Sequence, residues 1–322
     1  MKSSATSQKA LKGIQTPKYK SRRTRGLVWV CDVADSSRLL NQNETAAATE
    51  SFLERFLYFA LTAVNASGGT FVKWTGDGFL AFFETPLDRE VGSKAAVIFE
   101  AAWWLTAFVN ETQMCCPTEG RFRIRHAVTY EKDAVWIDLR HSGDIKSKDV
   151  LGRSVVAAFR LSGIECTFPG IVTHGEIVRA IGDANLTTHV TFKELPLTDA
   201  MRSRYFKGER FGTKDICVSA NKSRRIPYKP VKFEQRNAQI TSGRKVPDTD
   251  LNLFPFRRDF FVALASRRGP RWFQPVLREF GKKVFVPAIT ASLSKRQRST
   301  PSFARFVEAW ERDSTNIDVL HE

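Results

Sequence analysis

Two aspartates at the ends of predicted strands are the residues of this chain best placed to do chemistry. Asp32 follows the apolar run of residues 26–31, and Asp77 lies in a Thr-Gly-Asp-Gly sequence between two further apolar runs. The second pattern predicts a β-hairpin with Asp77 at its tip. Two carboxylates on adjacent strand ends can hold two divalent cations, and paired cations suit phosphoryl transfer. A simpler interpretation of Asp77 is a turn residue, since Asp-Gly is a favoured hairpin dipeptide.

These aspartates need a sheet to bring them together. The apolar periodicity predicts strands at residues 27–33, 121–129, 134–138 and 170–173, a hairpin at 71–83, a strand pair within 207–220, and helices at 43–65, 89–110, 150–162 and 174–181. This order predicts an α+β sandwich in which helices pack on a mostly antiparallel sheet.

Composition indicates a large globular domain with an addition. The chain has 322 residues, 42% of them hydrophobic, which is enough for a full core. It has no run of about 18 apolar residues and no secretory signal, so we expect no membrane-spanning helix. Its five cysteines show no zinc or disulfide spacing, which suits a reducing cytoplasm.

The positive charge is concentrated at the two ends. Residues 1–25 carry eight Lys or Arg and no acid, residues 222–322 have a net charge of +11, and the total is +16. We therefore predict a basic tail (1–25), a catalytic domain of net charge −3 (26–221), and a basic, aromatic-rich appendage (222–322). Basic flanks can bind nucleic acid or membrane, or attract a nucleotide. For residues 1–20 a solvated tail is the favoured interpretation.

Three segments together resemble class III nucleotidyl cyclases in their order and spacing. They are the Asp32 strand, the hairpin sequence Lys-Trp-Thr-Gly-Asp-Gly at 73–78, and residues 149–160. The resemblance covers about residues 25–220. It implies a ferredoxin-like sandwich and an enzyme that converts a nucleoside triphosphate to a 3′,5′-cyclic mononucleotide and pyrophosphate.

The resemblance implies a role for each matching residue near the phosphates. Asp32, Asp77 and the backbone carbonyl of Val33 match ligands of two Mg²⁺ or Mn²⁺ ions per site. One cation would activate the ribose 3′-hydroxyl and the other would hold the triphosphate. Arg160 matches an arginine that stabilises charge on the α-phosphate, although it could be a surface residue at a helix end. Lys207 matches a lysine that contacts the terminal phosphates, but its spacing from Arg160 is longer than usual.

Asp35 is a weaker candidate metal ligand and could simply cap the following segment. Two other residues, Lys73 and Asp149, match the pair that reads the base in adenylate cyclases. Lys donates to a ring nitrogen and Asp accepts from an exocyclic amine, a pattern offered by adenine and cytosine. Uracil could satisfy the pair with its carbonyl and N3–H, whereas guanine fits worst. The bulky side chains Phe52, Phe56 and Trp74 could narrow the base pocket, but core packing is the favoured interpretation.

The sequence departs from the cyclase pattern at two places. Val156 occupies the position where the family has an asparagine that bonds the ribose, so the sugar must be positioned otherwise or activity is lowered. The strand after Arg123 lacks the family's glycine near Thr129, and Arg125 and His126 add charge there.

Sites in this family form between two catalytic domains packed head to tail. One chain here carries both sets of residues, so the resemblance implies a homodimer with two sites and an inactive monomer. The free-standing layout and Val156 favour a Pycsar-type antiphage cyclase, which makes cyclic CMP or cyclic UMP for a separate effector. The alternatives are a conventional adenylate cyclase making cyclic AMP, and an inactive cyclase-like protein whose appendage binds nucleic acid.

Overall fold

The computed structural model describes a sheet with helices on both faces. The described residues are 18–34, 36, 53, 56–57, 59–61, 63–115, 123–140, 146–166, 169–186, 188, 190–206, 216–220, 299 and 304. The strands follow the order β2-β3-β1-β4-β6-β8-β7, and β5 pairs with β4. Only β4 and β6 run parallel among the described strand pairs, which confirms the predicted α+β class with a mostly antiparallel sheet.

The bounds of the elements are as follows. The strands are β1 (Lys18–Ala34), β2 (Thr70–Trp74), β3 (Gly78–Glu84), β4 (Arg123–Arg140), β5 (Lys146–Leu151), β6 (Ile171–His174), β7 (Thr191–Glu194) and β8 (Ile216–Ala220). The helices are the 3₁₀ turn η3 (Asp88–Glu90), α4 (Val91–Cys115), α5 (Arg153–Leu161), α6 (Gly175–Asp183) and α7 (Asp199–Tyr205). No helix of the described segments is both long and apolar enough to cross a membrane.

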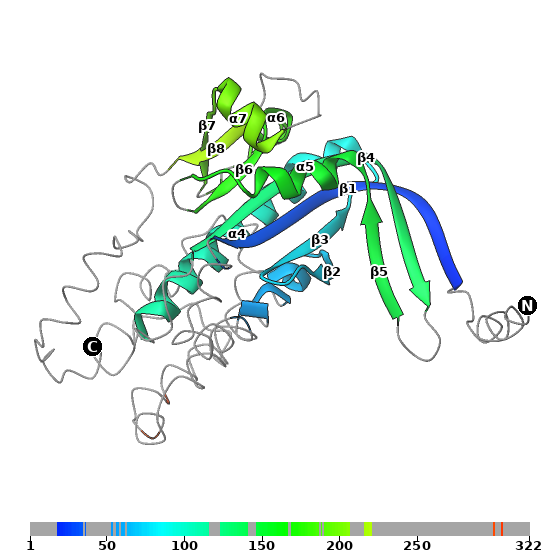
Figure 1. The fold of residues 1–322 in the computed structure, drawn as a ribbon, viewed down its shortest axis with the longest axis horizontal. Coiled ribbons are helices and arrows are strands. Elements are labelled where there is room, and N and C mark those ends of the chain that lie inside the picture. The colour runs from blue at the N-terminus through cyan, green and yellow to red at the C-terminus, as the bar shows by residue number, and fades with distance from the viewer. Residues whose placement is uncertain are drawn as a thin grey trace, which may run out of the picture.

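The centre of the sheet is made by two long antiparallel strands, β1 and β4, which pair along almost their whole length. Beyond the body of the domain, the first half of β1 continues beside the β4–β5 hairpin as a long arm (Figure 1). Two strands predicted at 121–129 and 134–138 are thus one strand, and the strand predicted at 27–33 begins at Lys18. The sequences at the start of β1 and the end of β4 show no alternation of apolar and polar residues, so they gave no strand signal. Their backbones nevertheless pair with each other.

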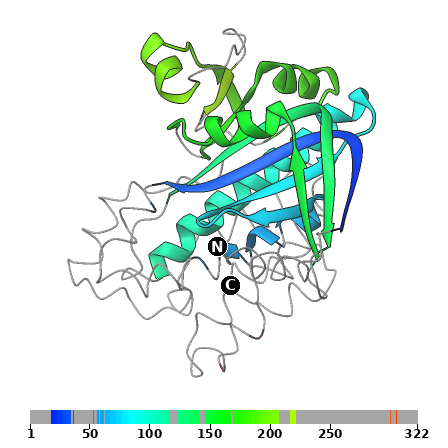
Figure 2. The ribbon, with the colours of Figure 1, turned by 45° about the vertical axis from the view of Figure 1, so that its right-hand side comes forward.

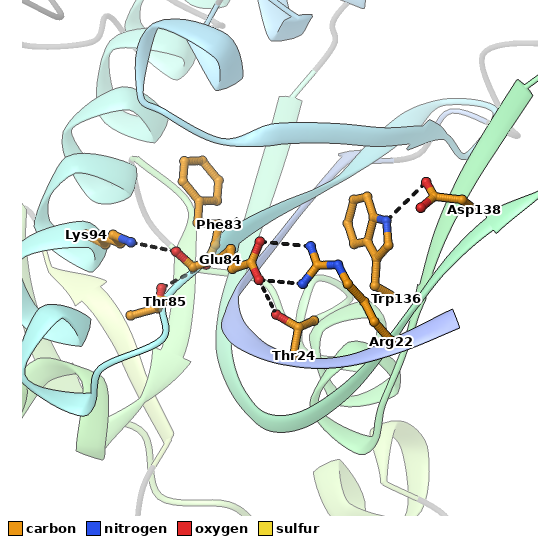
Figure 3. A network of polar contacts seen from close by, with 8 residues as sticks. All are labelled: Arg22, Thr24, Phe83, Glu84, Thr85, Lys94, Trp136 and Asp138. Atoms are coloured by element: carbon orange, nitrogen blue, oxygen red, sulfur yellow. Dashed lines mark hydrogen bonds and ion pairs between the residues drawn. The ribbon is translucent and has the colours of Figure 1, made fainter. Parts of the chain in front are cut away.

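The start of β1 is held by an ion pair at the end of β3. Both terminal nitrogens of Arg22 donate to the carboxylate of Glu84, at 2.5 and 2.9 Å, and Thr24 donates to the same carboxylate at 2.8 Å (Figure 3). The Arg22 guanidinium also lies over the Trp136 ring, 5.8 Å from its centroid. Part of the predicted basic tail therefore belongs to the sheet.

Alternate residues of β1 are buried on opposite faces of the sheet. Leu27, Trp29, Cys31 and Val33 pack in a core shared with α4, whereas Val28 and Val30 pack in a second core that includes residues of α5. A strand that is buried on both faces has apolar residues at every position of its sequence. This is why residues 27–31 show no alternation of apolar and polar residues. Figure 2 shows α4 on one side of these strands and α5 on the other.

The predicted helices are confirmed with shifted bounds where the structure describes them, and residues 43–52 of the first helix lie outside the described chain. Residues 53, 56–57, 59–61 and 63–66 are helical, and Gly68 follows them with φ of +77°. The helices predicted at 89–110 and 174–181 correspond to α4 and α6, and the strand predicted at 170–173 corresponds to β6.

Three features of the second half of the domain were not predicted. The predicted start of a helix at Val150 is wrong, because Val150 belongs to β5 and is buried opposite Trp136, and α5 begins after Gly152. Strands β5 and β7 and helix α7 were missed. Of the strand pair predicted within 207–220, β8 is present and pairs with β7. Residues 207–215 lie outside the described chain, as does nearly all of the appendage.

Candidate functional site

Asp32 and Asp77 lie side by side at one end of the sheet. In the β1–β3 ladder, Asp32 is directly opposite Gly78, the residue that follows Asp77. A Cβ atom on Gly78 would collide with the Cys31 carbonyl and the Asp32 Cα, so glycine is required for this close approach. Gly76, at the other side of Asp77, has φ of +98°, which glycine adopts without strain. Both glycines of the turn therefore serve to place Asp77 against β1.

The environment of this pair disfavours two uncompensated carboxylates. Burial raises the pKa of Asp32 above its ordinary value, and the nearby charge of Asp77 raises it further, although Arg125 acts in the opposite direction. The Ser36 hydroxyl donates to Oδ2 of Asp77. A divalent cation at this place would favour the ionised form of Asp32, because opposite charge lowers a carboxyl pKa.

Asp32 and Asp77 are oxygen donors of the kind that Mg²⁺ and Mn²⁺ prefer. No group of three or more His, Cys, Asp or Glu gathers as a metal site within the described segments. A cation held here would therefore rely on two carboxylates and on oxygens from elsewhere, such as a backbone carbonyl or substrate phosphates. Val33, whose carbonyl was the predicted third ligand, directly follows Asp32 in β1 and is itself buried. The pair of carboxylates fits such an ion.

Arg125 is a residue of this site that sequence reasoning did not assign to it. It lies opposite Asp32 in the β1–β4 ladder, and its Nη2 donates to Asp32 Oδ2 at 2.5 Å. Asp32 and Arg125 are 93 positions apart, and their pairing depends on strand register. The only signal in the sequence was that an arginine stands at an unusual position.

The neighbouring His126 does not add charge, which corrects the expectation from its sequence position. It is fully buried, and burial lowers its pKa to about 3. The Trp29 indole N–H donates to its Nδ1 at 3.2 Å, so the ring proton lies on Nε2 and is donated to the Thr106 hydroxyl at 2.8 Å. His126 is therefore a neutral, fully bonded core residue.

Lys73 and Asp149 are brought together from β2 and β5. The Lys73 ammonium lies 2.7 and 2.9 Å from the two carboxylate oxygens of Asp149. The side chains are 43% and 25% exposed, so the pair remains open to solvent and to a ligand. A donor and an acceptor fixed next to each other can recognise the hydrogen-bonding edge of a base.

Of the remaining predicted site residues, the structure describes the two that lie on α5. Val156 is 46% exposed, and Arg160 lies one turn later on the same side of the helix, in its last turn. Lys207 and Asp35 lie outside the described residues.

The aromatic residues considered for the base pocket are core residues where the structure describes them. Phe56 is 1% exposed, and its ring lies 5.7 Å from that of Trp74 and 6.2 Å from that of Phe79. Phe52 lies outside the described residues. Phe56 therefore belongs to the core and does not support the idea that bulky side chains narrow a base pocket.

Comparison with known proteins identifies the fold. No family model and no curated protein matches the chain. The adenylyl cyclase CyaB from P. aeruginosa is similar over 64% of this chain and 98% of that chain, with a TM-score of 0.51 and 17% sequence identity. A bacterial light-regulated adenylyl cyclase matches over 69% of this chain and 58% of its own, with a TM-score of 0.48 and 12% identity. The guanylyl cyclase Cya2 matches over 63% and 96%, with a TM-score of 0.44 and 15% identity. At 17% identity, the first likeness shows the fold alone, and it confirms the predicted cyclase-type sandwich.

Proposed function

We propose that the chain is a metal-dependent nucleotidyl cyclase, which converts a nucleoside triphosphate to a 3′,5′-cyclic mononucleotide and pyrophosphate. The observation that carries this proposal is the placement of Asp32 and Asp77 side by side. Gly78 makes it possible, because it has no side chain between β1 and β3. A cyclase-type fold around this pair supports the proposal. The fold by itself would not, because one fold can host unrelated functions.

Asp32, Asp77 and the carbonyl of Val33 would hold Mg²⁺ or Mn²⁺, two ions per site. The bound ions would lower the pKa of the ribose 3′-hydroxyl and offset the charge of the triphosphate. Arg160 would donate to the α-phosphate as negative charge grows on it, a task that suits the guanidinium fork. Lys207 would contact the terminal phosphates and orient the pyrophosphate leaving group.

We propose further that two copies of the chain form each site. Asp32 and Asp77 of one copy would then face Lys73, Asp149 and Arg160 of its mate. Exposed apolar side chains near these residues support a covering partner: Leu151 is 52% exposed, Val156 46% and Phe159 39%. A symmetric dimer would contain two such sites.

For the base, the Lys73–Asp149 pair supports adenine, cytosine or uracil and disfavours guanine, which would present a donor to the lysine. We favour a pyrimidine, and with it a cytoplasmic Pycsar-type role in which cyclic CMP or cyclic UMP activates a separate antiviral effector. The support is Val156, which removes the polar contact to the sugar found in the cyclase family. Cyclic AMP is the alternative product.

The test is turnover by the purified full-length protein with Mn²⁺ and each of ATP, GTP, CTP and UTP, with products identified by mass. We expect one cyclic mononucleotide and pyrophosphate, and loss of both in Asp77→Asn. Asp138→Asn is a matched control, because Asp138 lies on β4 and bonds the Trp136 indole at 3.2 Å. Failure of all four nucleotides to cyclise would overturn the proposal, and cyclic AMP as the main product would overturn the choice of a pyrimidine.

A further inference from the structure

The contact between Arg125 and Asp32 joins a positively charged side chain to a proposed cation ligand. The two residues are direct cross-strand partners, so their side chains lie on the same face of the sheet. Arg125 Nη2 lies 2.5 Å from Asp32 Oδ2, and the side chains are only 22% and 25% exposed. Solvent therefore screens this ion pair less than it screens pairs on the open surface.

The guanidinium is nevertheless incompletely bonded in this position. Its Nη1 reaches the Gly163 carbonyl only at 3.4 Å, and its Nε is buried with no hydrogen-bond partner in the described chain. A buried donor without a partner is costly. Arg125 therefore contacts Asp32 while one of its own donors is left without a partner among the described residues.

A cavity of about 120 Å³ lies beside Arg125 and offers its side chain a second place. Arg125 itself lines this cavity, together with Arg123, Glu165, Cys166 and Gly170. The Glu165 carboxylate is 71% exposed and lies 3.9 Å from Arg123, so it is held weakly. A guanidinium that left Asp32 would find both room and an acceptor there.

We propose that Arg125 competes with the divalent cation for Asp32 and moves toward the Glu165 cavity when the cation binds. This inference rests on the proposed function, because it takes Asp32 as a cation ligand. A cation would lie about 2.0–2.6 Å from an oxygen of the Asp32 carboxylate, so it would place a second positive charge beside the Arg125 guanidinium and repel it. Arg125 acts as a positioning residue: it holds the carboxylate in place before the cation arrives and raises the cation concentration that the site needs.

The test is Mn²⁺ binding to the full-length protein without nucleotide, followed by electron paramagnetic resonance and by the Mn²⁺-dependent rise in melting temperature. We expect Arg125→Gln to bind Mn²⁺ about tenfold more tightly than wild type, because a charge-assisted hydrogen bond no longer competes. The control is Arg23→Gln, which removes the same charge from an exposed ion pair with Asp133, far along β1 from Asp32. It should change the Mn²⁺ affinity by less than about threefold.

A second variant keeps the inference testable if Arg125→Gln folds poorly. Glu165→Gln removes the negative charge that we expect to attract the displaced guanidinium, at an exposed position, and it should weaken Mn²⁺ binding by about two- to threefold. In the Arg125→Gln background, where it can be made, the same change should have no effect, because the two residues would no longer be coupled.

The outcomes separate this inference from the proposed function. If Asp32→Asn leaves Mn²⁺ binding unchanged, Asp32 is not a cation ligand, and both the inference and the metal site of the proposed function are overturned. If Asp32→Asn abolishes binding but Arg125→Gln binds no more tightly than wild type, only the competition by Arg125 is overturned. An unchanged affinity in Glu165→Gln would overturn the movement into the cavity.

Discussion

Lys73 and Asp149 form an ion pair across β2 and β5, with the ammonium 2.7 Å from one carboxylate oxygen and 2.9 Å from the other. Each side chain is therefore the other's hydrogen-bond partner. At 43% and 25% exposure, such a pair contributes only about 1 kcal/mol or less to stability. A base that satisfies the donor and the acceptor can replace it at little cost.

We predict that Asp149→Ala will impair nucleotide recognition much more than folding. Loss of one good hydrogen bond to the base should raise KM for the preferred nucleotide by about tenfold or more, because a buried donor of the base is left unpaired. The melting temperature should fall by only a few degrees. Steady-state kinetics and a thermal scan test this, and an unchanged KM would rule out contact between Asp149 and the base.

Gly78→Ala should damage both the fold and the site. The added Cβ would push β3 away from Cys31 and Asp32, and we expect a loss of about 1–3 kcal/mol in the free energy of unfolding. Mn²⁺-dependent turnover should fall with it, because Asp77 would no longer lie against Asp32.

Gly182→Ala is the matched control for that substitution. Gly182 lies in α6, and apart from its chain neighbours and its own helix backbone a Cβ atom there would meet no heavy atom of the described residues within 4 Å. Alanine should stabilise the helix by about 0.5–1 kcal/mol. Urea unfolding of the two variants in parallel measures the contrast, and equal stability of Gly78→Ala and wild type would contradict the close approach of β1 and β3.

His126 should make the protein sensitive to acid. Its pKa is lowered to about 3 in the folded state from an ordinary value of 6.5, so the unfolded chain binds the proton more readily. The stability that neutral His126 contributes is complete above pH 6.5 and is lost progressively as the pH falls toward 3. Between pH 6.5 and 5 the loss is about 2 kcal/mol.

His126→Gln isolates this effect, because glutamine does not titrate. We expect the variant to be less stable than wild type at pH 7, since the bonds to Trp29 and Thr106 are disturbed. The difference in free energy of unfolding should narrow by about 2 kcal/mol between pH 7 and pH 5. If instead the difference in free energy of unfolding between the two proteins is the same at pH 7 and pH 5, His126 does not take up a proton on unfolding.

The parts of the fold that were predictable are those with local signals. The Asp-Gly turn between two apolar runs gave the β2–β3 hairpin, and the 3.6-residue periodicity gave α4 and α6. The polar halves of β1 and β4 carry no such signal. Their strand structure comes from pairing with each other over more than a hundred positions, as the Arg23–Asp133 bond illustrates.

The candidate site divides in the same way. Lys73, Asp77 and Asp149 could be chosen from residue type and motif spacing. The contact between Arg125 and Asp32 could not, because a one-residue change in register would move Arg125 to the opposite face of the sheet. The neutral state of His126 also depends on burial by residues distant in sequence, which no local pattern reveals.

A complementation experiment tests most directly whether two copies of this chain build a cyclase site. We predict that Asp77→Asn and Arg160→Ala are each inactive alone, and that co-expression of the two restores about a quarter of wild-type Mn²⁺-dependent turnover. Half of randomly paired dimers would be mixed, and each mixed dimer would contain one intact site of two. Active wild type with no recovery in the mixture would contradict a shared site, and inactive wild type with every nucleotide would contradict the cyclase itself.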